Sequence, residues 1–129
     1  MATAQILVVD DNPTNLKLLR VLLVREGYEV ATAASAEEAE ALIGKRIPDL
    51  VLMDIQLPGV DGLTLTRRLK ADPRTQRIVV IAVTAYAMKG DEEKALSAGC
   101  DAYLTKPIDT RGLPEVIARE LGGRGSAEA

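Results

Sequence analysis

The segment LVLMDIQLPGVDG, from Leu50 to Gly62, joins an apolar run to an aspartate and then to a turn. The run from Leu50 to Met53 lacks the polar alternation of a half-exposed strand, which predicts a strand buried on both faces. Asp54 closes this strand, and the proline and glycines that follow favour a tight loop. An amphipathic stretch from Leu63 to Ala71 then predicts a helix, so the segment forms one strand, loop and helix unit.

The same unit repeats on both sides of this segment. Four further apolar runs predict strands, at Ile6 to Val9, Val30 to Ala33, Ile78 to Val83 and Ala102 to Leu104. Amphipathic stretches predict the other helices, at about Pro13 to Glu26, Ala36 to Ile43, Met88 to Ala98 and Leu113 to Leu121. Asn12 is placed to cap the first helix and Gly27 to end it. Strict alternation of strand and helix predicts a doubly wound α/β fold, with a five-stranded parallel sheet and helices on both faces.

Length and composition indicate one soluble domain. The chain has 129 residues, of which 47% are hydrophobic and 27% charged, enough to bury a core. We expect the domain to cover residues 1–121, and the glycine-rich residues 122–129 to form a flexible tail. The apolar runs are too short to span a membrane, and no signal peptide is evident, so we expect a cytoplasmic protein.

Charge and residue usage exclude several classes of function. The formal net charge is -3 and no run of basic residues is present, which argues against direct binding of nucleic acid. The absence of histidine excludes Ser-His-Asp catalysis, histidine-ligated zinc and a role as phosphohistidine donor. Cys100 is the one cysteine, so no internal disulfide forms, and we expect it to be a small buried residue.

Polar and charged residues gather where the predicted strands end. In a doubly wound sheet, ligands bind beyond the carboxyl ends of the strands. The residues at these ends are Asp10, Asp11, Asp54, Thr84 and Lys106. If the first and third strands are neighbours, three carboxylates converge and repel unless a cation intervenes. Oxygen ligands alone favour a hard cation, Mg²⁺ or in its place Mn²⁺. Taken singly, each aspartate could instead be an ordinary cap of a helix or turn.

A carboxylate beside Mg²⁺ can accept a phosphoryl group, because phosphoryl transfer depends mainly on positioning and on neutralising the charge of the phosphoryl oxygens. Lys106 would supply positive charge. Thr84 would donate its hydroxyl to a phosphoryl oxygen, a contact that only the phosphorylated state makes. Such a difference between two states is what a molecular switch requires.

Four segments resemble the receiver domains of bacterial two-component response regulators. They are VVDDN at Val8 to Asn12, LVLMDIQLPGVDG at Leu50 to Gly62, VTAYA at Val83 to Ala87, and YLTKPID at Tyr103 to Asp109. The resemblance covers almost the whole chain. It implies strand order 2-1-3-4-5, and it identifies the chain as a stand-alone receiver that signals by phosphorylation instead of acting as a metabolic enzyme.

The resemblance also implies a role for each site residue. Asp54 would be the phosphoacceptor, and Asp11, Asp54 and the backbone carbonyl of Gln56 would be ligands of Mg²⁺, with Asp10 acting through a metal-bound water. Lys106 would pair with the phosphoryl group, and a cis bond to Pro107 would aim it into the site.

Further residues would link phosphorylation to signalling. Thr84 and Tyr103 match the switch pair of the family, in which the tyrosine ring turns inward when the threonine hydroxyl contacts the phosphoryl group. This motion would alter the face formed by helix four, strand five and helix five. Gln56 and Tyr86 lie where side chains control access of water, and so tune dephosphorylation.

The implied partners are a sensor histidine kinase or phosphotransfer protein, and a downstream protein that binds the switch face. The chain would be a monomer or a phosphorylation-promoted dimer, with kinase specificity on helix one, at Asn15, Leu18 and Leu22. Three alternatives remain at this stage: an aspartyl-phosphate phosphatase, a flavin-binding module, and a receiver cut from a larger regulator or hybrid kinase. Asp54-Ile55-Gln56 in place of Asp-x-Asp argues against the first, and an acidic loop after strand one against the second.

Overall fold

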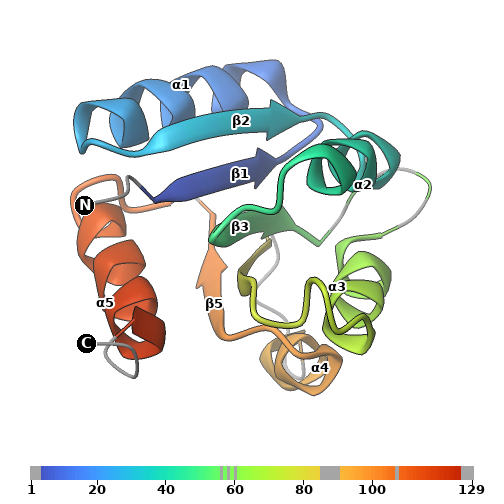
Figure 1. Ribbon diagram of the computed structural model, residues 1–129. Coiled ribbons are helices and arrows are strands. Elements are labelled where there is room, and N and C mark those ends of the chain that lie inside the picture. Colours follow the sequence, from blue (N-terminus) through green and yellow to red (C-terminus); the bar gives the residue numbers. More distant parts are fainter. Residues whose placement is uncertain are drawn as a thin grey trace.

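Strands and helices alternate along the chain in the computed structural model, which describes residues 4–55, 57, 59, 61–84, 91–106 and 108–125 (Figure 1). The strands are β1 (Gln5–Val9), β2 (Glu29–Ala33), β3 (Leu50–Asp54), β4 (Val79–Thr84) and β5 (Ala102–Thr105). The helices are α1 (Pro13–Arg25), α2 (Ala36–Lys45), α3 (Gly62–Ala71), α4 (Asp91–Ala98) and α5 (Leu113–Gly125). The strands pair in parallel in the order β2-β1-β3-β4-β5, which confirms the predicted doubly wound fold.

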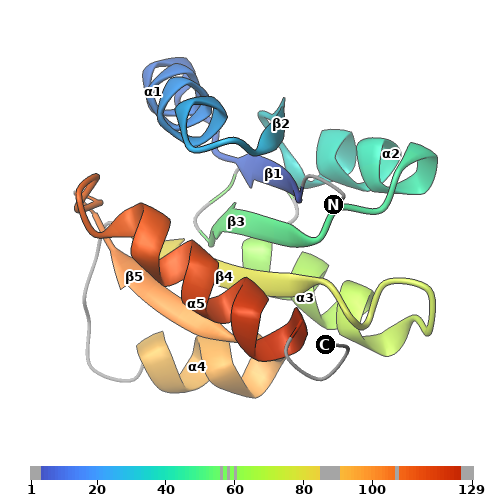
Figure 2. The same ribbon diagram turned by 60° about the vertical axis from the view of Figure 1, so that its left-hand side comes forward.

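The helices cover both faces of the sheet, with α1 and α5 on one face and α2, α3 and α4 on the other (Figures 1 and 2). Successive residues of a strand point to opposite faces. In β1, Ile6 and Val8 therefore pack with α1 and α5, whereas Leu7 and Val9 pack with the other three helices. The central strands are buried on both sides, which is why their sequences are continuously apolar.

Helix α1 begins and ends where its sequence predicts. The side chain of Asn12 accepts hydrogen bonds from the backbone N–H groups of Thr14 and Asn15, at 2.9 and 3.3 Å. At the other end, Gly27 has a φ of 95° and its N–H donates to the Val24 carbonyl, while the next N–H donates to Leu23. These two bonds satisfy carbonyls of the last turn. Asn12 thus starts α1 three residues after β1 ends at Val9.

The last helix extends further than its sequence predicts. Helix α5 continues to Gly125, beyond the predicted end at Leu121, so residues 122–125, predicted as the start of the tail, are helical. The boundary was predicted wrongly because glycine weakens a helix by only about 1 kcal/mol per residue and does not by itself end one. Residues 126–129 of the predicted tail, and residues 88–90 of the predicted fourth helix, lie outside the described residues.

Within the described ranges, every helix is too short or too polar to cross a membrane.

Cys100 is buried and free, as expected, and 3.8 Å separate its Sγ from Thr66 Oγ1. Burial raises the pKa of the Cys100 thiol more than this contact with Thr66 lowers it. The thiol is therefore part of the core and is protonated at neutral pH.

Alanine substitutions at Gly44 and Gly27 should change the free energy of unfolding in opposite directions. An added Cβ at Gly44, in α2, or at Gly27 meets nothing within 4 Å, so only conformation distinguishes the two sites. Gly44→Ala should raise the free energy of unfolding by about 0.4–1 kcal/mol, because alanine has the better helix propensity. Gly27→Ala should lower the free energy of unfolding, because Gly27, unlike Gly44, has a positive φ that alanine adopts only with strain. Urea unfolding of both variants checks this, and equal shifts of the same sign would contradict it.

Candidate functional site

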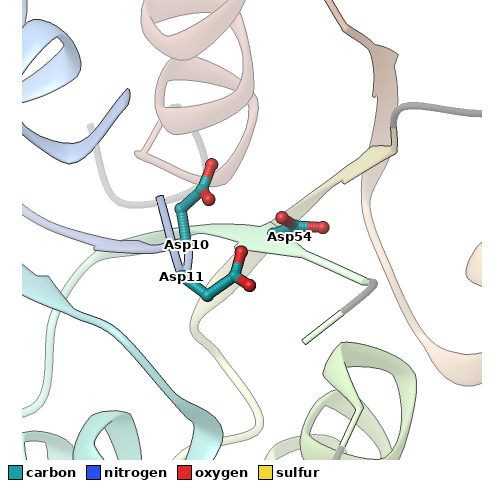
Figure 3. Close-up of side chains that lie close together, drawn as sticks. All are labelled: Asp10, Asp11 and Asp54. Atoms are coloured by element: carbon teal, nitrogen blue, oxygen red, sulfur yellow. The ribbon is translucent and has the colours of Figure 1, made fainter. Parts of the chain in front are cut away.

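Three carboxylates meet at the carboxyl edge of the sheet. Asp10 and Asp11 follow β1, Asp54 is the last residue of β3, and one oxygen of each lies within 4.8 Å of the others (Figure 3). Asp10 and Asp54 are each only 4% exposed, whereas Asp11 is exposed. Pairing of β1 with β3 brings the groups together, as the sequence predicts for neighbouring strands. The aspartates are therefore a cluster, and Asn12 is the residue that caps α1.

Lys106 joins this cluster from the end of β5. Its Nζ lies 3.0 Å from Asp54 Oδ2 and 3.1 Å from Asp10 Oδ2. Its backbone N–H donates to the carbonyl of Thr84 at 2.7 Å, which fixes the start of the loop. Burial alone would lower the pKa of Lys106, but the bonds to Asp54 and Asp10 raise it above its usual value. The ammonium is thus positively charged at neutral pH.

The cluster carries more negative than positive charge among the residues that the structure describes. Lys106 offsets one of the three carboxylates, which have oxygens within 4.8 Å of one another. At such short range, like charges repel by roughly 4 kcal/mol at an effective dielectric near 20. The donor atoms are carboxylate oxygens, which suit a hard divalent cation, and Asp11 leaves the cluster open to solvent on one side. The residues present therefore fit a metal ion of this kind.

Neighbouring groups hold Asp10 in place. Asp10 Oδ1 accepts the backbone N–H of Asn12 at 2.9 Å, and Oδ2 accepts Nδ2 of Asn15 at 3.3 Å. Sequence reasoning treated Asn15 only as a surface residue of helix one and missed this contact. The signal was its place in the first turn of the helix that begins directly after Asp10, which brings its side chain back to the strand end.

The predicted switch residues lie on adjacent strands. Thr84 ends β4 and is fully buried, and Tyr103 lies in β5, where it pairs in register with Ala82. Tyr103 is half-buried against the core cluster on the α2, α3 and α4 face, and its hydroxyl oxygen is shielded from solvent. Thr84 and Tyr103 thus lie on neighbouring strands, and their role as a switch pair stays a prediction. Gln56, Tyr86 and Pro107 lie outside the described residues.

A doubly wound sheet with a carboxylate cluster and a lysine at its carboxyl edge is the architecture of a receiver domain. Residues 6–118 match the response regulator receiver domain family, and the chain belongs to this family. It is 48% identical over 120 residues to the polar-differentiation response regulator DivK of Brucella ovis. The aligned residues cover 93% of this chain and 98% of that relative. DivK of Brucella anthropi is 48% identical over 117 residues, covering 91% and 95%.

Solved structures agree with this assignment. A CheY-like receiver domain protein from Methanospirillum hungatei superposes with a TM-score of 0.91 at 35% identity, covering 98% of this chain and 99% of that one. The receiver domain of the sensor histidine kinase PA1611 from Pseudomonas aeruginosa has a TM-score of 0.85 at 36% identity, covering 94% and 99%. That structure is described with a magnesium ion coordinated in its active site cleft.

The charge of the cluster predicts a metal-dependent stability. In urea unfolding, Mg²⁺ at about a hundred times its Kd should raise the free energy of unfolding of the wild type by about 2.7 kcal/mol over the same protein in EDTA. Asp54→Asn should abolish most of this increase, because it removes one carboxylate, and its charge, from the cluster. Asp72→Asn, at the end of α3 remote from the cluster, is the control and should keep the full increase. An Asp54→Asn protein as responsive to Mg²⁺ as the wild type would refute the site.

Proposed function

We propose that the chain is a phosphorylation switch of a two-component pathway, in which Asp54 accepts a phosphoryl group from a histidine kinase or phosphotransfer protein. The observation that carries the proposal is the convergence of Asp10, Asp11, Asp54 and Lys106 at one edge of the sheet. Membership of the receiver family supports it. In this proposal the chain is a signalling protein of the cytoplasm, and the chemistry at Asp54 serves signalling and not metabolism.

The residues of the site fit each part of the transfer. A carboxylate oxygen of Asp54 attacks phosphorus, the bond from phosphorus to the donor imidazole nitrogen breaks, and that nitrogen keeps the electron pair. Lys106, already 3.0 Å from Asp54 Oδ2, holds a positive charge beside the incoming phosphoryl oxygens. In a separate hydrolysis step, water attacks phosphorus, the bond from phosphorus to the Asp54 oxygen breaks, and inorganic phosphate leaves, which restores the free carboxylate and resets the switch.

A divalent cation fits beside these residues. Asp11 and Asp54 would hold Mg²⁺, or Mn²⁺ in its place, and Asp10 would hold one of its waters; the backbone carbonyl of Gln56 is the further ligand that the family pattern supplies. When bound, the ion supplies positive charge to the phosphoryl oxygens. The ion in the PA1611 receiver domain supports this part of the proposal.

The output of the switch would be the face formed by α4, β5 and α5. Thr84 ends the strand next to β5, so a hydroxyl drawn toward a phosphoryl group on Asp54 would change the surroundings of Tyr103. Leu96, on α4, is 48% exposed, so this helix offers an apolar side chain to a partner. A downstream protein that binds this face would distinguish the phosphorylated from the free state.

The phosphoryl donor would dock beside α1. Leu18, Val21 and Val24 form an exposed apolar stripe on this helix, each more than half exposed, and the helix begins at the acidic cluster. Leu22, predicted as a specificity residue, is half-buried and packs against the core. Its neighbour Val21 is the more exposed of the two side chains. Because α1 begins at the acidic cluster, a protein bound along this helix would lie beside the carboxylate that accepts the phosphoryl group in this proposal.

The direct test of this function is chemical labelling. With Mg²⁺ and a small-molecule phosphodonor such as acetyl phosphate, intact-mass spectrometry should show one added phosphoryl group per chain, because one carboxylate is placed as acceptor. Asp54→Asn or excess EDTA should abolish the addition. Undiminished labelling of Asp54→Asn, or no labelling of the wild type by any donor or kinase, would refute the proposed function.

The docking of the donor is tested separately. Leu18→Asp should slow phosphotransfer from a histidine kinase of the source organism by about tenfold or more, since that corresponds to losing about 1.4 kcal/mol of contact at a binding surface. Labelling by acetyl phosphate should be unchanged, because the site is intact. Ile47→Asp is the matched control, since Ile47 is 49% exposed but lies before β3, at the opposite edge of the sheet. Equal rates for the two variants would show that α1 is not the docking face.

A further inference from the structure

Gly62, the first residue of α3, lies against the backbone of the phosphoacceptor. A Cβ added at this position would lie 2.6 Å from the carbonyl oxygen of Asp54 and 2.8 Å from the Cα of Ile55. It would also lie 2.8 Å from Cγ of Met53. Two of these three atoms belong to the backbone, so a side chain could be accommodated only by moving the end of β3 or the start of α3.

The requirement for glycine here concerns space and not backbone conformation. The φ angle of Gly62 is outside the positive region, so alanine could adopt its conformation. Gly27 is the opposite case, because its φ is 95° and an added Cβ would meet nothing within 4 Å. The two glycines therefore separate a steric requirement at the site from a conformational requirement remote from it.

One hydrogen bond holds the start of α3 against the residue that follows β3, and two others fix the backbone of its first turn. The N–H of Gly62 donates to the carbonyl of Ile55 at 3.3 Å, and the hydroxyl of Thr66 donates to the carbonyl of Gly62 at 2.8 Å within the core. Asp61 caps the helix by accepting the N–H of Thr64 at 2.8 Å. The start of α3 is thus held beside the end of β3, so a side chain at residue 62 would press on the backbone of Asp54.

We infer that Gly62 is a positioning residue for Asp54. Its lack of a side chain lets the start of α3 press against the carbonyl of Asp54, and this contact sets where the carboxylate lies relative to Asp10, Asp11 and Lys106. The inference rests on the proposed function, because it assigns Gly62 to the same metal and phosphoryl-acceptor site. Loss of the contact should weaken metal binding and slow phosphorylation, apart from any loss of stability.

The test compares Gly62→Ala with Gly27→Ala, both of which are expected to destabilise the fold. Isothermal titration calorimetry of the folded proteins should show Mg²⁺ binding weakened by about tenfold or more in Gly62→Ala, the size of effect that loss of support for a metal ligand causes. Gly27→Ala should bind Mg²⁺ as the wild type does. The rate of labelling by acetyl phosphate should fall in Gly62→Ala alone. Equal Mg²⁺ affinities in the two variants would overturn the inference.

Two further measurements guard against a variant that fails to fold. Gly44→Ala, which should stabilise α2, provides a background in which Gly62→Ala can be studied. In the wild type, the amide resonance of Gly62 should shift in NMR spectra as Mg²⁺ is added, and a fixed Gly62 resonance beside a shifting Asp54 resonance would overturn the inference. A wild type that binds Mg²⁺ but accepts no phosphoryl group would instead refute the proposed function.

Discussion

The ammonium of Lys106 lies 3.0 Å from Asp54 and 3.1 Å from Asp10, and these two contacts tie the last strand of the sheet to the first and third. The sheet is parallel, so all its carboxyl ends lie at one edge, and this topology brings together charges that are far apart in the sequence. One ammonium does not balance three carboxylates. The cluster therefore favours a further positive group, and in the proposed function a phosphoryl group enters with its charge compensated.

Support for this cluster comes from the helices that begin beside it. The first turn of α1 supplies the N–H of Asn12 and the amide of Asn15 to Asp10. The start of α3 presses against the backbone of Asp54 at Gly62. The carboxylates are thus held by rigid elements on both sides, which limits how they can relax from their mutual repulsion. Because these supports restrict movement of the carboxylates, the carboxylates stay close together, in an arrangement that suits a cation.

Much of the fold follows from local patterns in the sequence. Continuous apolar runs mark the strands, since both faces of a covered parallel sheet are buried, and Asn12 and Gly27 mark the ends of α1. The strand-end positions of Asp10, Asp54 and Lys106 likewise predict the cluster once the strand order is given by the family pattern. The end of α5 was missed because glycine residues near a helix end weaken it without determining where it stops. The contact of Asn15 with Asp10 could be inferred from its place in the first turn of α1, whereas the contact of Gly62 with Asp54 depends on tertiary packing that no local pattern encodes.

The most direct test of the central claim, that these carboxylates share one hard cation, is anomalous diffraction from a crystal grown with Mn²⁺. The expected result is one strong peak between the carboxylates of Asp11 and Asp54, at a direct coordination distance of about 2 Å and beside Asp10. A peak at another place on the surface, or none at the carboxyl edge of the sheet while Mn²⁺ is present in excess, would contradict it.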